Sequence, residues 1–169
     1  MDLIIRQENK KDYIKSENVV IEAFKSKEGV VPEEKDLVAK LRKSKAFIPE
    51  LSLVAEFNRK IVGYVLFTKL IIKDGAKEEI SLALAPVAVL PEYQNKGIGS
   101  RLVVEGLKKA KELGYKSVIV LGHAEYYPRF GFKPASNWNI KPPYNWPDES
   151  FMALELEDES LKNVKGTVI

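Results

Sequence analysis

The chain has 169 residues, 45% of them hydrophobic and 30% charged, with 27 basic and 24 acidic side chains and a net charge of +3. These values are typical of a globular protein, so we expect residues 1–169 to fold as one domain, and the interleaved charges argue against a nucleic-acid-binding stripe. The absence of cysteine excludes disulfides and thiolate metal sites, and a single histidine excludes a histidine-rich metal centre.

The N-terminal residues lack the basic start and the long apolar run of a signal peptide. No apolar stretch in the sequence is long enough to span a bilayer. We therefore expect a cytoplasmic protein with no membrane partner and no metal.

The first elements are predicted to be a strand and a helix. Leu3 to Ile5 form a short apolar run, and Asn9 or Asp12 is suited to cap a helix that ends near Phe24. Apolar residues recur at helical spacing behind this cap. The residues expected on the buried face are Ile14, Val19, Val20, Ala23 and Phe24.

A second helix is predicted after Gly29. Pro32 is suited to its first turn, because the missing N–H of proline has no helical partner there. Leu37, Val38 and Leu41 are expected to face inward.

Three antiparallel strands are predicted next. Leu51 to Phe57 and Ile61 to Ile72 are rich in β-branched and aromatic residues and are joined across Asn58-Arg59-Lys60, which indicates a hairpin. Asp74-Gly75 marks a second turn, and Ile80 to Leu90 reads as the returning strand.

The strand from Ile80 to Leu90 also begins a βαβ unit, in which a helix and a further strand follow it. The first strand contains Pro86, which cannot donate to a sheet, so we expect a bulge or splay there. The helix runs from Gly97 to about Leu113 and stops at Gly114, and Ser117 to Leu121 is the buried parallel strand. The expected buried residues of the helix are Ile98, Leu102, Val103, Gly106, Leu107, Ala110 and Leu113.

The remaining residues are rich in proline and glycine and are predicted to be mostly loops. The alternating run from Phe151 to Leu156 is expected to form the last strand. The sequence therefore predicts a mixed α/β fold.

The segment Gln94-Asn95-Lys96-Gly97-Ile98-Gly99 lies between a strand and a helix and has the features of an anion site. Its glycines allow a tight backbone path, and the first N–H groups of the helix have no internal acceptor. The spacing lacks the lysine of a P-loop and the third glycine of a dinucleotide fold, since Leu102 stands there. A plain structural turn at Gly97 and Gly99 is the alternative interpretation.

Two motifs in order resemble the GNAT N-acetyltransferase family. Val87 to Leu102 resembles its acetyl-CoA signature, Q/R-x-x-G-x-G/A, with the preceding V-x-V-x-P strand end. Tyr126 to Phe132 resembles the Y-x-x-x-G-F block that follows the next strand. The resemblance covers nearly the whole chain and is greatest to the YhbS-like subgroup.

The resemblance implies a GNAT-like fold, with a central, mostly antiparallel sheet splayed between two strands and flanked by helices. It implies acetyl-CoA as co-substrate, with backbone groups of Val87, Ala88 and Val89 on the pantetheine arm and the thioester. The N–H groups of residues 95 to 100 would hold the pyrophosphate. The cofactor-binding residues implied are Val87, Ala88, Val89, Gln94, Asn95, Lys96, Gly97, Ile98, Gly99, Ser100 and Arg129.

The resemblance also implies the chemistry. An amine attacks the thioester directly in a ternary complex, and backbone donors near Val87 to Val89 stabilise the oxyanion by about 3 to 4 kcal/mol each. Tyr127 matches the family tyrosine that protonates the departing thiolate; packing against Tyr126 is the alternative role.

The general base is not given by the motif. Many family members carry a glutamate at the position that Ala85 occupies here, so a direct carboxylate base on that strand is absent. His123 and Glu125 follow the βαβ strand and are the candidate bases, acting through water; a loop role is the alternative for the histidine.

The acceptor is expected to be an amine of a small molecule or peptide. Its pocket would form from the first two helices, the hairpin turn and residues 137–146, where Trp138, Tyr144 and Trp146 line an apolar slot or simply cover the core. A non-catalytic acyl-CoA-binding or regulatory module on the same fold is the alternative function. A homodimer is left open by the sequence.

Overall fold

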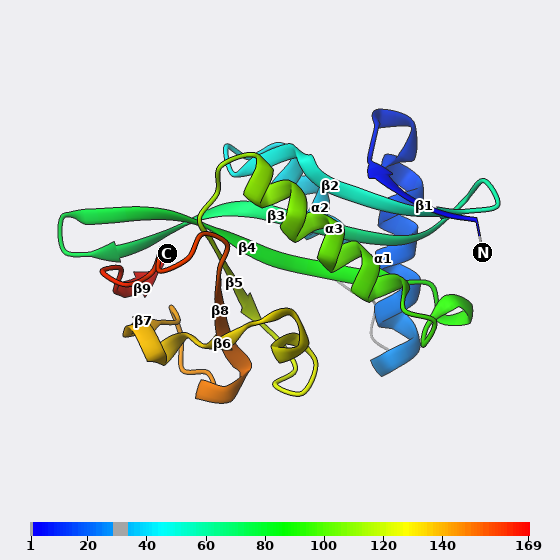
Figure 1. Ribbon diagram of the computed structural model, residues 1–169. Helices are drawn as coiled ribbons and strands as arrows, with labels where there is room; N and C mark the ends of the chain where they lie inside the picture. The colour runs from blue at the N-terminus through cyan, green and yellow to red at the C-terminus, as the bar shows by residue number, and fades with distance from the viewer. Residues whose placement is uncertain (1, 29–33) are drawn as a thin grey trace. The chain divides into compact units, whose positions relative to one another are not determined.

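The computed structural model describes residues 2–28 and 34–169. Gly29 and Pro32, at the predicted boundary between the first two helices, lie outside the described residues. The α-helices are α1 (Tyr13–Glu28), α2 (Glu34–Arg42) and α3 (Ile98–Glu112) (Figure 1). Short 3-10 helices are η1 (Lys10–Asp12), η2 (Pro91–Tyr93), η3 (Tyr127–Phe130), η4 (Ala135–Trp138) and η5 (Asp148–Ser150).

The strands are β1 (Leu3–Gln7), β2 (Phe47–Phe57), β3 (Lys60–Asp74), β4 (Lys77–Val89), β5 (Ser117–Leu121), β6 (Lys133–Pro134), β7 (Ile140–Lys141), β8 (Phe151–Glu155) and β9 (Gly166–Val168). Hydrogen-bonded neighbours follow the order β1-β2-β3-β4-β5-β8-β6. The sheet is mostly antiparallel, with parallel pairing of β4 with β5 and of β7 with β9. The predicted fold class is confirmed.

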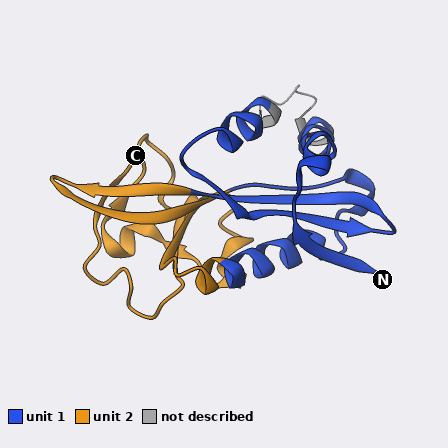
Figure 2. Ribbon diagram, turned by 90° about the horizontal axis from the view of Figure 1, so that it is seen from above, with its two compact units in different colours: residues 1–68, 85–109 blue, residues 69–84, 110–169 orange. Residues whose placement is uncertain are grey.

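The chain divides into two compact units, which Figure 2 shows in different colours. Unit 1 contains residues 1–68 and 85–109, and unit 2 contains residues 69–84 and 110–169. Strands β3 and β4 and helix α3 contribute residues to both units. Whether the chain acts as a single domain stays a prediction.

The hairpin of β2 and β3 in unit 1 has a tight turn whose conformation suits the two strands. Strands β2 and β3 pair antiparallel up to Phe57 and Lys60, so Asn58 and Arg59 form a two-residue turn. Both turn residues have positive φ, 50° and 65°, which is the conformation of the tight hairpin turn that matches strand twist. The predicted hairpin is confirmed.

Helix α3 lies close to the sheet in unit 1 because two glycines allow it. A Cβ on Gly106 would overlap the ring of Phe67, and one on Gly63 would lie 2.9 Å from Leu102 Cδ1. The predicted apolar face is buried at Ile98, Leu102 and Val103. This close packing fixes the position of the N-terminus of α3 against the strands of unit 1.

The C-terminal end of α3 follows the predicted glycine cap. Gly114 has φ 93° and donates to Lys111 O at 3.0 Å, and Tyr115 donates to Ala110 O at 3.1 Å. The prediction that Leu113 is buried is wrong. Leu113 is 38% exposed, because it follows the last helical residue, Glu112.

Two further burial predictions are wrong. Ile14 is 74% exposed, because the helical repeat places it opposite the buried face formed by Val19, Val20 and Ala23. Leu37 is 45% exposed, because the buried side of α2 is centred on Val38 and includes Arg42 one turn later.

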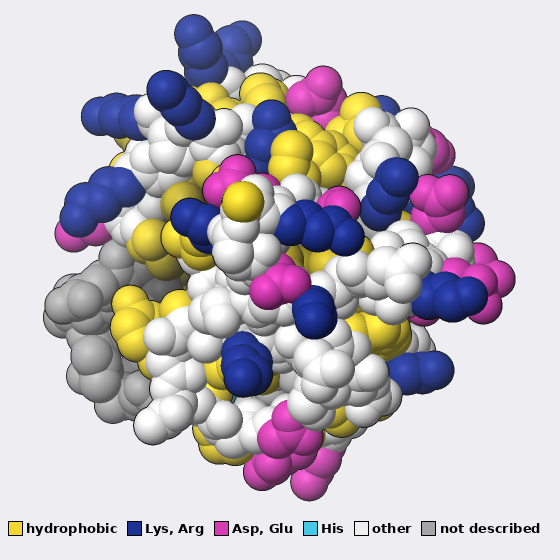
Figure 3. Space-filling view, turned by 90° about the vertical axis from the view of Figure 1, so that its left-hand side faces the viewer, with side chains coloured by type: hydrophobic (Ala, Val, Ile, Leu, Met, Phe, Trp, Pro, Cys, Tyr) yellow, Lys and Arg dark blue, Asp and Glu magenta, His cyan; other side chains and the backbone are white. Residues whose placement is uncertain are grey.

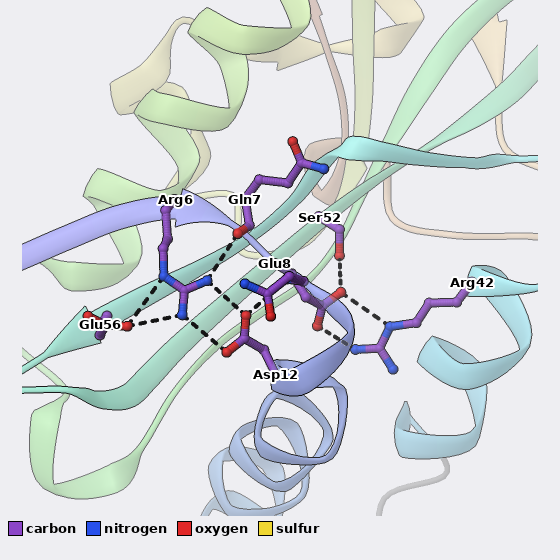
Figure 4. Close-up of polar contacts among 8 residues, drawn as sticks. Arg6, Gln7, Glu8, Asp12, Arg42, Ser52 and Glu56 are labelled. Atoms are coloured by element: carbon purple, nitrogen blue, oxygen red, sulfur yellow. Dashed lines mark hydrogen bonds and ion pairs between the residues drawn. The ribbon is translucent and has the colours of Figure 1, made fainter.

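Polar contacts join α2, and η1 at the start of α1, to the sheet of unit 1 (Figure 4). Arg42 of α2 forms 2.6 Å ion pairs with Glu8 and with Glu17 of α1, and Glu8 also accepts a hydrogen bond from Ser52 of β2 at 2.6 Å. The side chains of Arg42 and Glu8 are 5% and 0% exposed. Removing one partner of such a buried pair costs about 3 to 5 kcal/mol, so this network holds α1 and α2 in place.

The predicted N-terminal cap is confirmed as a capping box. Asn9 and Asp12 exchange side-chain and backbone hydrogen bonds at the start of η1, which leads into α1. Asp12 also pairs with Arg6 at 2.8 Å, and these hydrogen bonds hold the pKa of Asp12 below its usual value. The helix runs to Glu28, beyond the predicted end near Phe24.

Unit 2 contains the parallel pair of the predicted βαβ unit. Leu82 and Ala83 of β4 pair with Val118 and Ile119 of β5. Strand β8 pairs antiparallel along the whole of β5, as expected for a returning strand. The Ala85–Pro86 peptide bond, where a bulge or splay was predicted, is cis.

The last strand was not the one predicted. Strand β9 follows β8 and pairs with β3 and β7, and its three residues are too few to give an alternating pattern. It closes a core of unit 2 that includes Ile72, Ile119, Ala135, Ile140, Phe151, Ala153, Leu161 and Val168.

Candidate functional site

The first candidate region, which we call the Gly97 loop, comprises residues 94–100 of unit 1. It leaves η2 at Gln94 and enters α3 at Ile98. Asn95 and Gly97 have φ of 61° and 81°, so left-handed residues alternate with others along the loop. A backbone of this kind directs neighbouring N–H groups to one side, which is how main-chain anion sites are formed.

Several N–H groups of the Gly97 loop are available to a ligand. Arg101 makes the first intrahelical bond of α3, to Gly97 O at 3.1 Å. Within residues 2–28 and 34–169, the N–H groups of Asn95, Gly97, Ile98 and Gly99 donate to no protein acceptor, whereas Gln94 and Asn95 form a turn that is closed at Lys96. Together with the positive end of the helix dipole, these N–H groups favour an anion.

The conformation of the loop depends on Gly97. A Cβ at this position would meet no atom within 4 Å, so space does not require glycine. The backbone angle requires glycine instead, because residues with a side chain rarely adopt a φ of 81°.

Gln94 ties the loop to the end of β4. Its side-chain amide donates to Val89 O at 3.0 Å. Leu90 donates to Val62 O of β3 at 2.9 Å, and polar groups alternate along an extended strand. The backbone groups of Val87 and Val89 therefore point away from β3, whereas those of Ala88 point towards it.

Aromatic and basic side chains lie beside the Gly97 loop. The ammonium groups of Lys60 and Lys96 lie 5.7 and 5.6 Å from the ring centre of Tyr93. Both lysines are exposed. They add positive charge near the loop, although exposed ammonium groups interact weakly in water.

The second candidate region, which we call the Tyr127 segment, comprises residues 122–132 of unit 2. It follows β5, and Gly122 donates to Ser150 O at 2.9 Å, which joins the segment to the residues before β8. The carbonyl of His123 accepts from the N–H groups of Tyr126 and Tyr127 at 3.1 and 3.4 Å. Helix η3 then ends at Gly131, whose φ is 100°.

Tyr127 packs within an aromatic cluster and directly over the backbone of Gly122, where a Cβ would overlap its ring. Its ring centre lies 5.1 Å from that of Tyr126 and 5.8 Å from that of Phe132. Burial, with a smaller contribution from Tyr126, raises the pKa of Tyr127 to about 12. The phenol is therefore protonated at neutral pH.

Arg129 is held by its own segment. Its guanidinium lies 4.3 Å from the ring centre of Tyr126, and its Nε donates to Tyr126 O at 2.9 Å. The predicted contact of Arg129 with a CoA phosphate stays a prediction.

A cavity of about 630 Å³, the His123 cavity, lies in unit 2. It brings the two predicted candidate bases, His123 and Glu125, to one site. Its lining residues are Leu121, Gly122, His123, Ala124, Glu125, Trp146, Pro147, Glu149 and Ser150.

A second cavity, the α1 cavity, has about 710 Å³ and lies in unit 1. Its lining residues are Lys15, Asn18, Val19, Glu22, Arg59, Lys60, Ile61, Leu90, Pro91 and Glu92. Val19, Ile61 and Leu90 are buried, and the charged residues are exposed. This cavity combines the first helix and the hairpin turn, and its role as part of the acceptor pocket stays a prediction.

The three aromatic residues predicted for the acceptor pocket have different surroundings. Trp138 packs against the core of unit 2, so it covers the core. Trp146 lines the His123 cavity and is 45% exposed, and Tyr144 is 72% exposed with its ring centre 6.5 Å from that of Trp146. The sequence did not single out Glu149, which lines the same cavity as His123 because the chain before β8 returns to the end of β5.

In residues 2–28 and 34–169, no cluster of three or more histidine or acidic side chains is arranged to hold a metal ion. In the same residues, no helix has the length and apolar character needed to cross a bilayer. Figure 3 shows basic and acidic side chains interspersed on the face in view, as the alternating charges of the sequence predict.

Comparison with known proteins identifies relatives along most of the chain. An acetyltransferase (GNAT) domain profile matches residues 49–134. The uncharacterized N-acetyltransferase YjhQ of Escherichia coli is 44% identical over 117 residues, which are 69% of this chain and 65% of YjhQ. The uncharacterized N-acetyltransferase YhbS of the same organism is 33% identical over 120 residues, 70% of each chain. The match therefore spans slightly less than two thirds of YjhQ.

Solved structures extend the similarity to the whole fold. Escherichia coli YhbS in complex with CoA aligns with a TM-score of 0.84 and 28% identity over 98% of this chain and 88% of YhbS. A GNAT family acetyltransferase from Brucella melitensis in complex with acetyl-CoA aligns with a TM-score of 0.79 and 31% identity over 98% and 94% of the two chains.

Proposed function

The chain belongs to the GNAT acetyltransferase family, and on that premise we propose that it transfers an acetyl group from acetyl-CoA to an amine of a small molecule or peptide. The observation that carries the proposal is the set of N–H groups of Asn95, Gly97, Ile98 and Gly99, which have no protein acceptor at the N-terminus of α3. We propose that they and Ser100 bind the pyrophosphate of acetyl-CoA. The CoA and acetyl-CoA complexes of the two solved relatives support this cofactor.

The end of β4 is proposed to hold the pantetheine arm and the thioester. The backbone groups of Val87 and the N–H of Val89 point away from β3, which suits them to bind an extended amide chain, whereas Val89 O already accepts from Gln94. A main-chain N–H there would stabilise the tetrahedral oxyanion by about 3 to 4 kcal/mol. Gln94 keeps the loop and this strand end together through its bond to Val89.

The proposed reaction is a direct transfer. The amine nitrogen attacks the thioester carbon, a C–N bond forms, and the C–S bond breaks to release CoA as thiolate. Tyr127 is proposed to donate its phenolic proton to that thiolate. Burial keeps this phenol protonated at neutral pH and also makes it a weaker acid, since its pKa is raised to about 12. The transfer therefore depends on the CoA thiolate being desolvated as well, because burial raises the pKa of a thiol above its ordinary value of about 8.5.

The base that accepts the amine proton is proposed to be His123 or Glu125. Both line the His123 cavity, and imidazole and carboxylate side chains are common general bases. Ala85 has no carboxylate to serve instead.

The same absence at Ala85 favours one rival function, a non-catalytic acyl-CoA-binding module. We propose the enzyme in preference because Tyr127 is retained. A single domain formed by residues 1–169, a cytoplasmic location and a homodimer stay predictions.

The proposal is tested in two steps. Calorimetric titration with acetyl-CoA should show saturable binding, and free-thiol release should then rise with some members of a panel of amines and peptides. Binding without thiol release would favour the binding module. Absence of binding would rule out both functions, and a Gly97→Val variant serves as the control for binding at the loop.

A further inference from the structure

The His123 cavity carries negative charge in a chain that is positive overall. The ionisable side chains that line it are those of Glu125, Glu149 and His123, and its lining contains no lysine or arginine. Within residues 2–28 and 34–169, neither carboxylate forms an ion pair with a protein cation. Unpaired carboxylates around a concave site attract a cation.

The cavity also offers an aromatic surface. Trp146 is 45% exposed and lies in the cavity wall. An indole face binds organic cations with about 0.5 to 2 kcal/mol. Its volume of about 630 Å³ lies within the range of small-molecule sites.

We propose that the acetyl acceptor is a small diamine bound in the His123 cavity, an inference that rests on the proposed acetyltransferase function. The two amines of such a molecule must be in different protonation states. The attacking amine must lose its proton, which suits the end beside His123 and Glu125. The other amine stays protonated and binds Glu149 and Trp146.

The architecture of the cavity supports this division of roles. His123 and Glu125 come from the segment after β5, whereas Trp146 and Glu149 come from the residues before β8. The hydrogen bond from Gly122 to Ser150 O joins these two walls. The cavity therefore presents two groups of side chains on two separate chain segments.

The α1 cavity is a poorer site for a dication. Its rim carries three cationic side chains, Lys15, Arg59 and Lys60, against two carboxylates, Glu22 and Glu92. A second ammonium would meet like charge there. The charge balance therefore assigns the diamine to the His123 cavity.

Binding can be measured without acetyl transfer. Trp138 and Trp146 are the two tryptophans of the chain, so Trp138→Phe leaves Trp146 as the fluorescent reporter. Three ligands share one four-carbon primary amine and differ at the far end: diaminobutane is cationic there, butylamine is neutral, and aminobutyrate is anionic. We expect diaminobutane to bind about tenfold more tightly than butylamine and aminobutyrate to give no saturable change.

The carboxylate is tested by Glu149→Gln, which should weaken diaminobutane binding about fivefold. Glu157→Gln is the matched control, because Glu157 is exposed and lies outside the cavity. Calorimetry on the otherwise unchanged chain repeats both titrations in case Trp138→Phe disturbs the core.

Similar affinity for diaminobutane and aminobutyrate, or unchanged affinity in Glu149→Gln, would overturn the inference whether or not acetyl-CoA binds. Acetylation of other amines without acetylation of diaminobutane would overturn it too and leave the acetyltransferase function intact. Failure to bind acetyl-CoA would instead refute the proposed function, because the Trp146 titration is read without the cofactor. Monoacetylated diaminobutane, detected by mass, is the expected product.

Discussion

The Gly97 loop and the Tyr127 segment offer chemistry in different ways. The Gly97 loop presents main-chain N–H groups, and its shape rests on the backbone angles of Asn95 and Gly97 and on one hydrogen bond from Gln94. The Tyr127 segment presents side chains, and its shape rests on packed aromatic rings.

This difference predicts how each region responds to substitution. A main-chain site tolerates a change of side chain as long as the backbone keeps its conformation. A side-chain site loses its chemistry with one functional group even when the packing is kept. The following variants test this contrast, beginning with the largest expected effect.

Tyr127→Phe should lower kcat about a hundredfold, the size typical of a lost proton donor. The ring and its contacts with Tyr126 and Phe132 remain, so affinity for acetyl-CoA should stay within about twofold. Steady-state thiol release and calorimetry measure the two quantities. An unchanged kcat would remove Tyr127 from the mechanism and leave it a packing residue.

The titration of Tyr127 should also differ from that of a tyrosine in water. Its pKa is raised from 10.0 to about 12, so the folded chain holds this proton more tightly than the unfolded chain. The stability that this group contributes is complete below pH 10 and is lost as the pH rises towards 12. The difference in tyrosinate absorbance between the unchanged chain and Tyr127→Phe should have its midpoint near pH 12, and a midpoint near 10 would contradict the burial of this phenol.

In the Gly97 loop, Gly97→Ala should weaken acetyl-CoA binding about tenfold, because a side chain costs about 1 to 2 kcal/mol in the left-handed conformation. Once saturated with acetyl-CoA, the variant should turn over at nearly the normal rate. Calorimetry and the dependence of rate on acetyl-CoA concentration separate the two effects.

Gly75→Ala is the matched control for that variant. Gly75 also has a positive φ, 61°, and also has open space around its Cβ position, but it lies in the turn between β3 and β4. The backbone cost should be similar and acetyl-CoA affinity unchanged. Equal loss of affinity in both variants would show that the effect comes from general destabilisation.

The contrast between the regions also explains what the sequence could predict. The Gly97 loop, the hairpin turn at Asn58 and the cap at Gly114 are local, since their backbone conformation is determined by residues next to one another. The His123 cavity is not local, because Trp146 and Glu149 reach it through the pairing of β8 with β5. The error at Leu37 has a similar origin, because Arg42 and its ion-pair partners occupy part of the buried side of α2. The error at Ile14 is local, because the helical repeat itself places this residue opposite Val19, Val20 and Ala23.

Lys96→Ala should have the smallest effect and is the most direct test of a main-chain site. Lys96 is exposed, and its ammonium lies over the ring of Tyr93, so its charge is well solvated and adds little to binding. Affinity for acetyl-CoA should fall by less than about twofold at physiological salt, and the loss should shrink further as salt is added. A tenfold loss that persists in high salt would mean that the lysine itself binds a phosphate, and the Gly97 loop would then resemble the Tyr127 segment in depending on a side chain.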